Sequence, residues 1–149
     1  MKYLLDASAL LPLVTRRGRQ LLLEATRADL IITDLAIYEA CNSLWKLSTL
    51  LKSISIEDAI DTATTIKDLA TRGMIKPIKF TKLDFSNTLQ IAYKEGITFY
   101  DASYIATARN AEATLVTEDE KLKKAASKFI KTITYSDLES KLTQTNGQK

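Results

Sequence analysis

Four acidic residues of this 149-residue chain could meet at one place in a folded domain. Two directly follow short apolar runs that are typical of buried strands, and two lie in stretches with helical periodicity; they are Asp6, Asp119, Asp101 and Glu39. In folds that alternate strands and helices, functional groups gather at the carboxyl edge of the sheet. The pattern therefore predicts a group of carboxylates at that edge.

Converging carboxylates favour a particular chemistry. Two carboxylates about 4 Å apart repel each other by roughly 4 kcal/mol at an effective dielectric constant near 20. They are stable together only if they take up protons or bind a hard divalent cation. Mg²⁺ or Mn²⁺ suits such oxygen ligands, whereas Zn²⁺ prefers nitrogen and sulfur. A cation of this kind activates water and stabilises charge on a phosphodiester.

The residue types that are missing exclude several other chemistries. The chain has no histidine, which rules out a Ser-His-Asp triad, a Cys-His pair and histidine-ligated zinc. Its four glycines form neither a Walker loop nor a GxGxxG loop. The single cysteine, Cys41, fits a reducing compartment. Because the N-terminus lacks the apolar run of a signal peptide, we expect a soluble, cytoplasmic protein.

Each of the four acids also has a purely structural interpretation. Asp101 and Asp119 are suited to helix N-termini, where the helix dipole stabilises acids. Glu39 could project into water from the rim of its helix. Asp6 is harder to explain in this way, because an acid at the end of a buried strand is costly unless it is paired or metal-bound. Only the four acids together favour a functional site.

Strands and helices alternate along the chain. We expect strands near residues 2–5, 30–32, 114–117 and 130–134, and an edge strand or extended connection at 74–80, where Pro77 interrupts the pattern. Helices are expected at 8–14, 16–27, 35–49, 55–72, 83–95, 101–110 and 118–127, and a last one opened by a Ser136–Glu139 capping box. The alternation predicts an α/β fold, a three-layer sandwich with a mostly parallel central sheet flanked by helices. Residues 1–142 would form one domain and residues 143–149 a polar, disordered tail.

Four short motifs follow one another in the chain. They are Asp6-Ala7-Ser8, Glu39-Ala40-Cys41-Asn42, Tyr100-Asp101-Ala102-Ser103-Tyr104 and Leu115-Val116-Thr117-Glu118-Asp119. In this order they resemble the motifs of the PIN-domain family, and within it the VapC-like toxins of type II toxin–antitoxin pairs. The resemblance extends from Tyr3 to about Tyr135 and implies a PIN-like ribonuclease that cuts single-stranded RNA with Mg²⁺ or Mn²⁺.

The resemblance also assigns roles to particular residues. The family's acidic residues fall on the four acids named above, and its supporting polar groups on Ser8, Asn42 and Thr117. We expect Asp6 and Asp101 to be the main metal ligands, with Glu39 and Asp119 completing the shell directly or through water. The supporting groups would orient the carboxylates and the bound waters.

Three adjacent acids, Glu118, Asp119 and Glu120, need separate assignments. We expect Thr117 to be the N-cap of the following helix and Glu120 to complete its capping box. Glu118 would point to solvent. Asp119 has a short side chain above the carboxyl edge of the sheet and matches the family's Thr-x-Asp pattern, so we assign it to the metal site.

RNA would be contacted by basic residues close to these motifs. The candidates are Lys46, Arg16, Arg17 and Lys121, although each one taken singly is more typical of a solvated surface. Residues 120–149 hold seven lysines against three acids, a net charge of +4, while residues 1–119 carry about −1. Two aromatic residues, Tyr38 and Trp45, could stack on bases, but we expect them to pack against the core.

The resemblance implies two protein partners, a second copy of the chain in a homodimer and an inhibitory antitoxin. Apolar residues of the early helices exceed what one sheet needs to cover it, which agrees with an interface; they include Leu44, Leu47, Leu50 and Leu51.

Other functional classes fit less well or remain open. A phosphatase of the haloacid-dehalogenase type also begins with a strand and an aspartate, but it needs a second acid where this chain has Ser8. A receiver domain needs an acidic pair and a later phosphoacceptor aspartate at a spacing that the chain lacks. The open alternative is a PIN-like scaffold that binds RNA or protein without cutting.

Overall fold

A five-stranded parallel sheet with the order β3-β2-β1-β4-β5 forms the centre of the computed structural model, which describes residues 1–24 and 26–146. The strands are β1 (Lys2–Leu5), β2 (Asp29–Thr33), β3 (Lys76–Ile78), β4 (Thr114–Val116) and β5 (Thr132–Ile133). Each strand overlaps a range that the sequence predicts, and every pairing is parallel. The predicted α/β class is confirmed.

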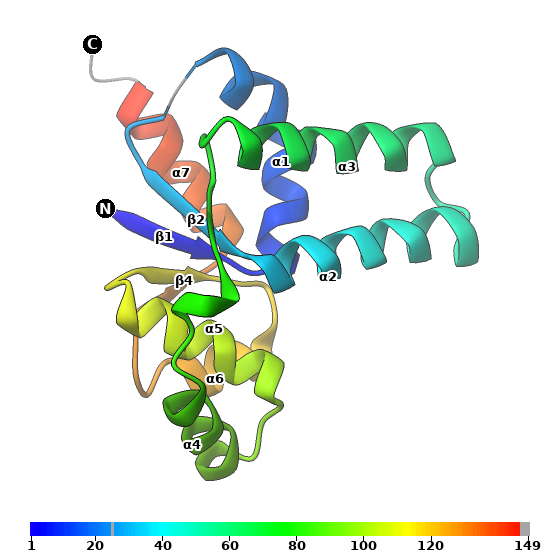
Figure 1. The fold of residues 1–149 in the computed structure, drawn as a ribbon. Helices are drawn as coiled ribbons and strands as arrows, with labels where there is room; N and C mark the ends of the chain where they lie inside the picture. Colours follow the sequence, from blue (N-terminus) through cyan, green and yellow to red (C-terminus); the bar gives the residue numbers. More distant parts are fainter. Residues whose placement is uncertain (25, 147–149) are drawn as a thin grey trace.

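Helices cover both faces of this sheet, as Figure 1 shows. One face carries α1 (Ala7–Leu23), α3 (Ile56–Thr71) and α7 (Tyr135–Asn146), and the other carries α4 (Phe85–Glu95), α5 (Phe99–Asn110) and α6 (Glu120–Ala126). The antiparallel pair α2 (Asp34–Trp45) and α3 projects beyond the sheet and is joined through the π-helical turn η1 (Lys46–Leu50). A short 3₁₀ turn, η2 (Phe80–Lys82), precedes α4.

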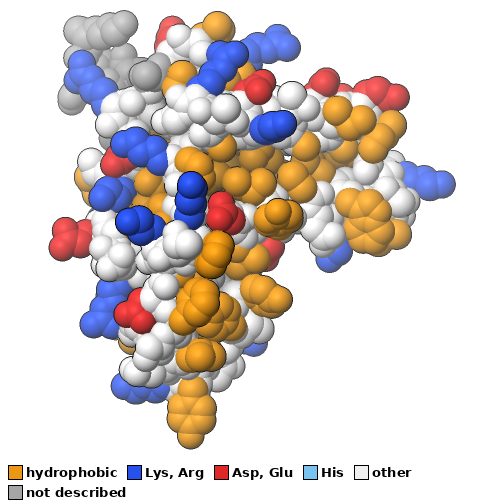
Figure 2. Space-filling model, viewed as in Figure 1, with side chains coloured by type: hydrophobic (Ala, Val, Ile, Leu, Met, Phe, Trp, Pro, Cys, Tyr) orange, Lys and Arg blue, Asp and Glu red, His pale blue; other side chains and the backbone are white. Residues whose placement is uncertain are grey.

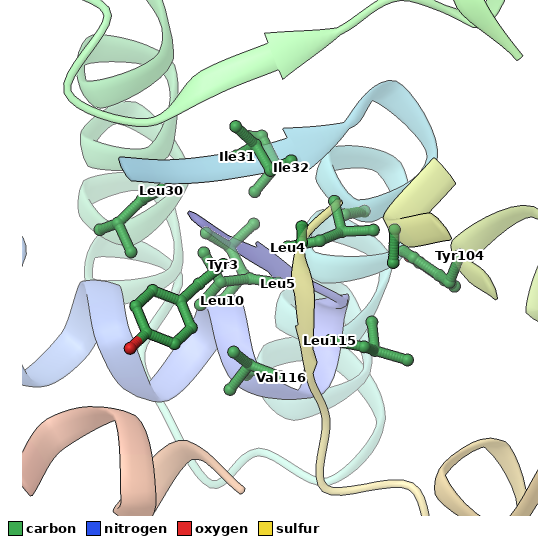
Figure 3. Packing of buried hydrophobic residues seen from close by; sticks show 14 of the residues in the cluster. Tyr3, Leu4, Leu5, Leu10, Leu30, Ile31, Ile32, Tyr104, Leu115 and Val116 are labelled. Atoms are coloured by element: carbon green, nitrogen blue, oxygen red, sulfur yellow. The ribbon is translucent and has the colours of Figure 1, made fainter. Parts of the chain in front are cut away.

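The neighbouring strands β1 and β4 are apolar because helices cover both of their faces. Leu4, Leu5 and Leu115 have no exposed surface. Figure 3 shows side chains of β1, β2 and β4 packed together with Leu10 of α1 and Tyr104 of α5. Burial of this kind fixes the position of the strand ends, where the predicted acids begin.

The chain changes direction across the sheet between β1 and β4. From β1 the strand order runs to β2 and β3 on one side, and the chain then crosses to β4 and β5 on the other. Crevices for ligands form at the carboxyl ends of two strands that diverge in this way. Asp6 follows β1 and Asp119 lies beyond β4, so both acids are placed at this crevice.

β3 is an edge strand, as the proline within it predicts. Pro77 lies opposite Ile32 of β2 and has no amide hydrogen to donate to a further strand. The sequence pattern 74–80 is therefore explained by a three-residue strand followed by a 3₁₀ turn.

The first helical region is one helix rather than the two that we predict from residues 8–14 and 16–27. Asp6 caps α1, which continues through Pro12 to Leu23. Thr15, at the expected break, stays in the helix with its hydroxyl donating to the carbonyl of Leu11 at 3.0 Å. Gly18 allows close approach to α3, since a Cβ there would lie 2.9 Å from Thr65 Cγ2.

The start and the end of the last helix also differ from the prediction. The capping box pairs Thr134 with Asp137, whose amide donates to Thr134 Oγ1 at 3.2 Å, and not Ser136 with Glu139. Thr134 directly follows the end of β5, which places the cap two residues earlier. The helix runs to Asn146, so residues 143–146 of the predicted tail are helical, and residues 147–149 lie outside the described residues.

Within residues 1–24 and 26–146, the helices are too short or too polar to cross a membrane.

Candidate active site

Asp6 is the buried centre of the site. Only 5% of its surface is exposed, and its backbone follows β1 directly. Oδ1 accepts the amide hydrogen of Ala9 at 3.0 Å and the hydroxyl hydrogen of Ser8 at 2.6 Å. Oδ2 accepts the hydroxyl hydrogen of Thr117. These donors hold the carboxylate in one orientation, and because Oδ2 accepts only one of the three hydrogen bonds, it keeps a lone pair available.

Thr117 and Ser8 also bind the backbone of the segment after β4. The amide of Asp119 donates to Thr117 Oγ1 at 3.0 Å, and the amide of Glu118 donates to Ser8 Oγ at 2.8 Å. The two hydroxyls that bind Asp6 therefore also hold the backbone of residues 118 and 119 next to it. This places Asp119 at the same edge of the sheet as Asp6.

Glu39 reaches the site from α2. Its Oε1 accepts the hydroxyl hydrogen of Tyr104 on α5 at 2.9 Å. Tyr104 is 2% exposed, so its ring is fixed and its hydroxyl sets the direction of the Glu39 carboxylate. Glu39 was predicted from the sequence, whereas its partner Tyr104 was not. The available signal was that Tyr104 lies three residues after Asp101, and therefore on the same side of α5.

The four acids line a single open cavity of about 530 Å³. Asp6 and Asp119 reach it from the ends of β1 and β4, Glu39 from α2 and Asp101 from the first turn of α5. The supporting residues Ser8 and Asn42 line the same cavity, whereas the buried Thr117 lies behind Asp6. The structure thus brings together the residues that the four motifs supply.

Burial and mutual repulsion raise the pKa values of three of these acids. Burial is the main cause for Asp6, opposed by hydrogen bonds from Ser8 and Thr117. Burial likewise raises the pKa of Glu39, and the negative charges of the other three acids raise it further. The pKa of Asp101 is raised by burial and by Asp119, and lowered by Lys121. The cavity therefore carries negative charge that is only partly compensated.

A family comparison agrees with this geometry. The model of the PIN domain matches residues 3–128, which includes all four acids. The chain belongs to the PIN-domain family.

The PIN domain is also similar to curated VapC proteins of Pyrobaculum aerophilum. It is 35% identical to the protein named Exonuclease VapC9 over 123 residues, covering 82% of this chain and 84% of that protein. It is 31% identical to Ribonuclease VapC3 over 130 residues, covering 82% of this chain and 92% of that protein. These similarities make it a VapC-like member of the family.

Solved structures share the fold. PAE2754 from Pyrobaculum aerophilum superposes with a TM-score of 0.72 at 28% identity, covering 97% of this chain and 99% of that one. VapBC-1 from nontypeable Haemophilus influenzae matches with a TM-score of 0.58 at 14% identity, covering 91% of this chain and 99% of that one. The second similarity is one of fold alone.

The face of α2 that we expected to pack against the core instead borders the cavity. The buried residues of α2 are Ala36, Ala40 and Leu44. Tyr38 lines the cavity with 77% of its surface exposed, and Trp45 is 48% exposed. The prediction that both aromatics pack in the core is therefore wrong, because small alanines provide the close contact of this helix with the rest of the domain.

The predicted basic residues fall into two groups. Lys46 lines the cavity, and Lys121 is close enough to Asp101 to lower its pKa. Arg16 and Arg17 contact Glu139 of α7 at 3.3 and 3.7 Å and do not line the cavity. Of these four residues, only Lys46 and Lys121 lie close enough to the acids to contact a substrate bound there.

The roles expected for the three adjacent acids need correction. Glu120 is the first residue of α6 and therefore does not complete the capping box that was expected with Thr117. Asp119, and not Thr117, is the N-cap of α6, with Oδ1 accepting the amide hydrogen of Leu122 at 3.1 Å. Glu118 does not simply point to solvent, since its Oε1 accepts the amide hydrogen of Tyr135 at 2.6 Å. The oxygen of Thr117 accepts the amide hydrogen of Asp119, which precedes α6, and the cap lies two residues further along the chain.

Proposed function

We propose that this PIN domain is an endoribonuclease that cuts single-stranded RNA with Mg²⁺ or Mn²⁺ and is the toxin of a cytoplasmic toxin–antitoxin pair. The observation that carries the proposal is the placement of four acids, from four separate parts of the fold, around one cavity at the carboxyl edge of the sheet. The two VapC relatives are named as an exonuclease and a ribonuclease, which supports nuclease chemistry.

The donor set of the cavity fits a hard divalent cation. Its candidate ligands are carboxylate oxygens, and burial and repulsion disfavour their charged forms unless a cation is present. In the described part of the chain, no three Asp, Glu or Cys side chains are already grouped tightly enough to hold an ion. Mg²⁺ does not need such a cage, because it usually keeps several waters and binds through one or two carboxylates.

Asp6 and Asp101 would be the direct ligands, with Glu39 and Asp119 bound directly or through water. The cation would supply an activated water and stabilise negative charge on the phosphate. Ser8, Ala9 and Thr117 hold the Asp6 carboxylate from the protein side, which leaves a lone pair on Oδ2 for the cation. Tyr104 directs Glu39 in the same way.

The rim of the cavity is suited to single-stranded RNA. Lys46 offers a positive charge to the phosphate backbone. Tyr38 of α2 and Tyr100 of α5 both line the cavity, and they are 77% and 62% exposed. Exposed aromatic rings stack on unpaired bases, which a duplex does not offer. Asn42 and Ser43 add polar side chains between Glu39 and Lys46.

A circular single-stranded RNA separates internal cleavage from digestion from an end. The protein should linearise and then fragment the circle in Mn²⁺ or Mg²⁺, and excess chelator should stop the reaction. A circle that survives while a linear RNA of the same sequence is degraded would show an exonuclease. If neither RNA is cut and Mn²⁺ causes no thermal shift, the chain is the non-catalytic scaffold instead.

We further propose that the domain forms a homodimer and binds an antitoxin. Figure 2 shows hydrophobic side chains gathered on the projecting end of α2 and α3. The exposed apolar residues there are Trp45, Leu50, Leu51, Ile56 and Ile60, while Leu44 is buried and Leu47 partly buried. Apolar surface in such amounts is typical of protein interfaces. Light scattering at micromolar concentration should give twice the mass of the chain; a strict monomer would contradict the dimer.

A further inference from the structure

Glu118 connects the candidate site to the last helix. It lies between Thr117 and Asp119 in a segment that belongs to neither a strand nor a helix. Its carboxylate accepts the amide hydrogen of Tyr135 at 2.6 Å, and its own amide donates to Ser8 Oγ at 2.8 Å. One residue thus contacts α7 through its side chain and the Asp6 network through its backbone.

The backbone around Glu118 determines where two site residues lie. Thr117 donates its hydroxyl hydrogen to Asp6 and accepts the amide hydrogen of Asp119 at 3.0 Å. Ser8, which accepts from Glu118, also donates to Asp6 at 2.6 Å. A displacement of Glu118 would therefore disturb both hydroxyls that orient Asp6, together with the position of Asp119.

Helix α7, which contacts the segment around Glu118, is itself packed firmly against the rest of the domain. Tyr135, Leu138 and Leu142 of α7 are buried, and Arg16 of α1 contacts both the ring of Tyr135 at 5.5 Å and the carboxylate of Glu139 at 3.3 Å. The amide of Tyr135 belongs to the first turn of α7, where amides lack intrahelical acceptors and a carboxylate is favoured. α7 also lies beyond residue 128, where the match to the PIN-domain model ends.

We infer that Glu118 is a positioning residue, through which α7 holds Thr117 and Asp119 in register with the buried Asp6. The inference rests on the proposed function for its catalytic consequence, because the residues held are those assigned to the cation. The carboxylate of Glu118 accepts a hydrogen bond from one amide, so its oxygen matters more than its charge.

Three variants separate positioning from general effects of charge and stability. Glu118→Ala removes the acceptor, and Glu118→Gln keeps an oxygen at the same reach. Glu120→Ala removes a charge two residues away, on an exposed side chain outside the cavity. For each folded variant we would measure kcat and KM on single-stranded RNA, the Mn²⁺ dissociation constant, and hydrogen exchange of the amides of residues 118, 119 and 135.

The inference predicts a distinct pattern across the three variants. Glu118→Ala should lower kcat about tenfold, equivalent to about 1.4 kcal/mol. It should weaken Mn²⁺ binding, leave KM within about twofold and speed exchange of all three amides. Glu118→Gln and Glu120→Ala should stay close to the wild type in every measurement.

Several results would overturn the inference. Glu118→Ala with unchanged kcat and Mn²⁺ affinity would reduce Glu118 to a helix cap, even if the variant melts at a lower temperature. If Glu118→Gln is as impaired as Glu118→Ala, or if Glu120→Ala shows an equal loss, activity depends on the negative charge of this segment and not on the hydrogen bond. A wild type without metal-dependent cleavage would refute the proposed function; unchanged exchange in Glu118→Ala would refute the structural connection itself.

Discussion

The hydroxyl of Tyr104 lies 2.9 Å from Oε1 of Glu39, and this hydrogen bond joins α5 to α2 at the candidate active site. The two residues are 65 positions apart, and Tyr104 is buried while Glu39 is exposed at the cavity. Burial raises the pKa of Tyr104 most, and Glu39 and the negative charge of Asp6 raise it further, so the phenol keeps its proton and acts as the donor.

Tyr104→Phe should remove the hydrogen bond that orients Glu39 without creating a cavity in the core. The ring stays in place, and the lost hydrogen bond to a carboxylate should cost about 1.5–3 kcal/mol of unfolding free energy at most. We expect RNA cleavage to fall several-fold, since Glu39 would no longer be oriented. Urea unfolding and steady-state cleavage test this; full activity in the variant would show that Glu39 needs no support from Tyr104.

Thr117→Val should be more damaging than its size suggests. The substitution conserves volume but removes the hydroxyl that donates to buried Asp6 and accepts from Asp119. Leaving such groups without partners costs about 1–3 kcal/mol. Thr117→Ser should retain most stability and activity. Thr114→Val, at the start of β4, is the matched control. An equally large loss in that variant would show that Thr117 has no special role.

Asp119→Asn tests the metal assignment separately from helix capping. Asparagine is as good an N-cap as aspartate, so α6 should keep its start. The loss of a charged ligand should reduce cleavage at least tenfold, equivalent to about 1.4 kcal/mol of transition-state stabilisation. Glu120→Gln should change cleavage little. If Asp119→Asn cuts RNA at the rate of the wild type, Asp119 serves only as the cap.

The positions of Asp6, Asp101 and Asp119 could be predicted from local pattern and parallel topology, whereas Glu39, within a helix, was assigned to the site by the family resemblance. Asp6 ends an apolar run that can only be a buried strand, and Asp119 lies just beyond another. Parallel strands place their carboxyl ends at one edge. The α/β class follows from the same alternation, and β3 from the restriction that Pro77 imposes.

The contacts between distant residues could not be predicted in the same way. Thr117 was expected to cap a helix, but its hydroxyl donates to Asp6, 111 positions away, and its oxygen accepts from the amide of Asp119. Glu118 was expected in solvent, but the start of α7 supplies an amide donor. In α2 the periodicity of large apolar residues pointed to the wrong face, because the close packing is made by Ala36 and Ala40.

The two exposed tyrosines of the cavity should bind bases. Tyr38→Ala and Tyr100→Ala should each weaken the binding of single-stranded RNA by about 1–3 kcal/mol. Phenylalanine at either position should preserve binding. Tyr93, which is 92% exposed on α4 and outside the cavity, provides the control Tyr93→Ala. Fluorescence anisotropy with a labelled oligonucleotide measures the affinities, and equal losses in all three alanine variants would argue against a stacking role.

The measurement that tests the central claim most directly is a calorimetric titration of the protein with Mn²⁺. The wild type should bind the ion, and Asp6→Asn and Asp101→Asn should each abolish or strongly weaken binding while remaining folded. Asp61→Asn, an exposed acid on α3 away from the cavity, should bind like the wild type. A wild type that binds no Mn²⁺, or unchanged binding in both Asp6→Asn and Asp101→Asn, would contradict the assignment of this cavity as a metal-dependent active site.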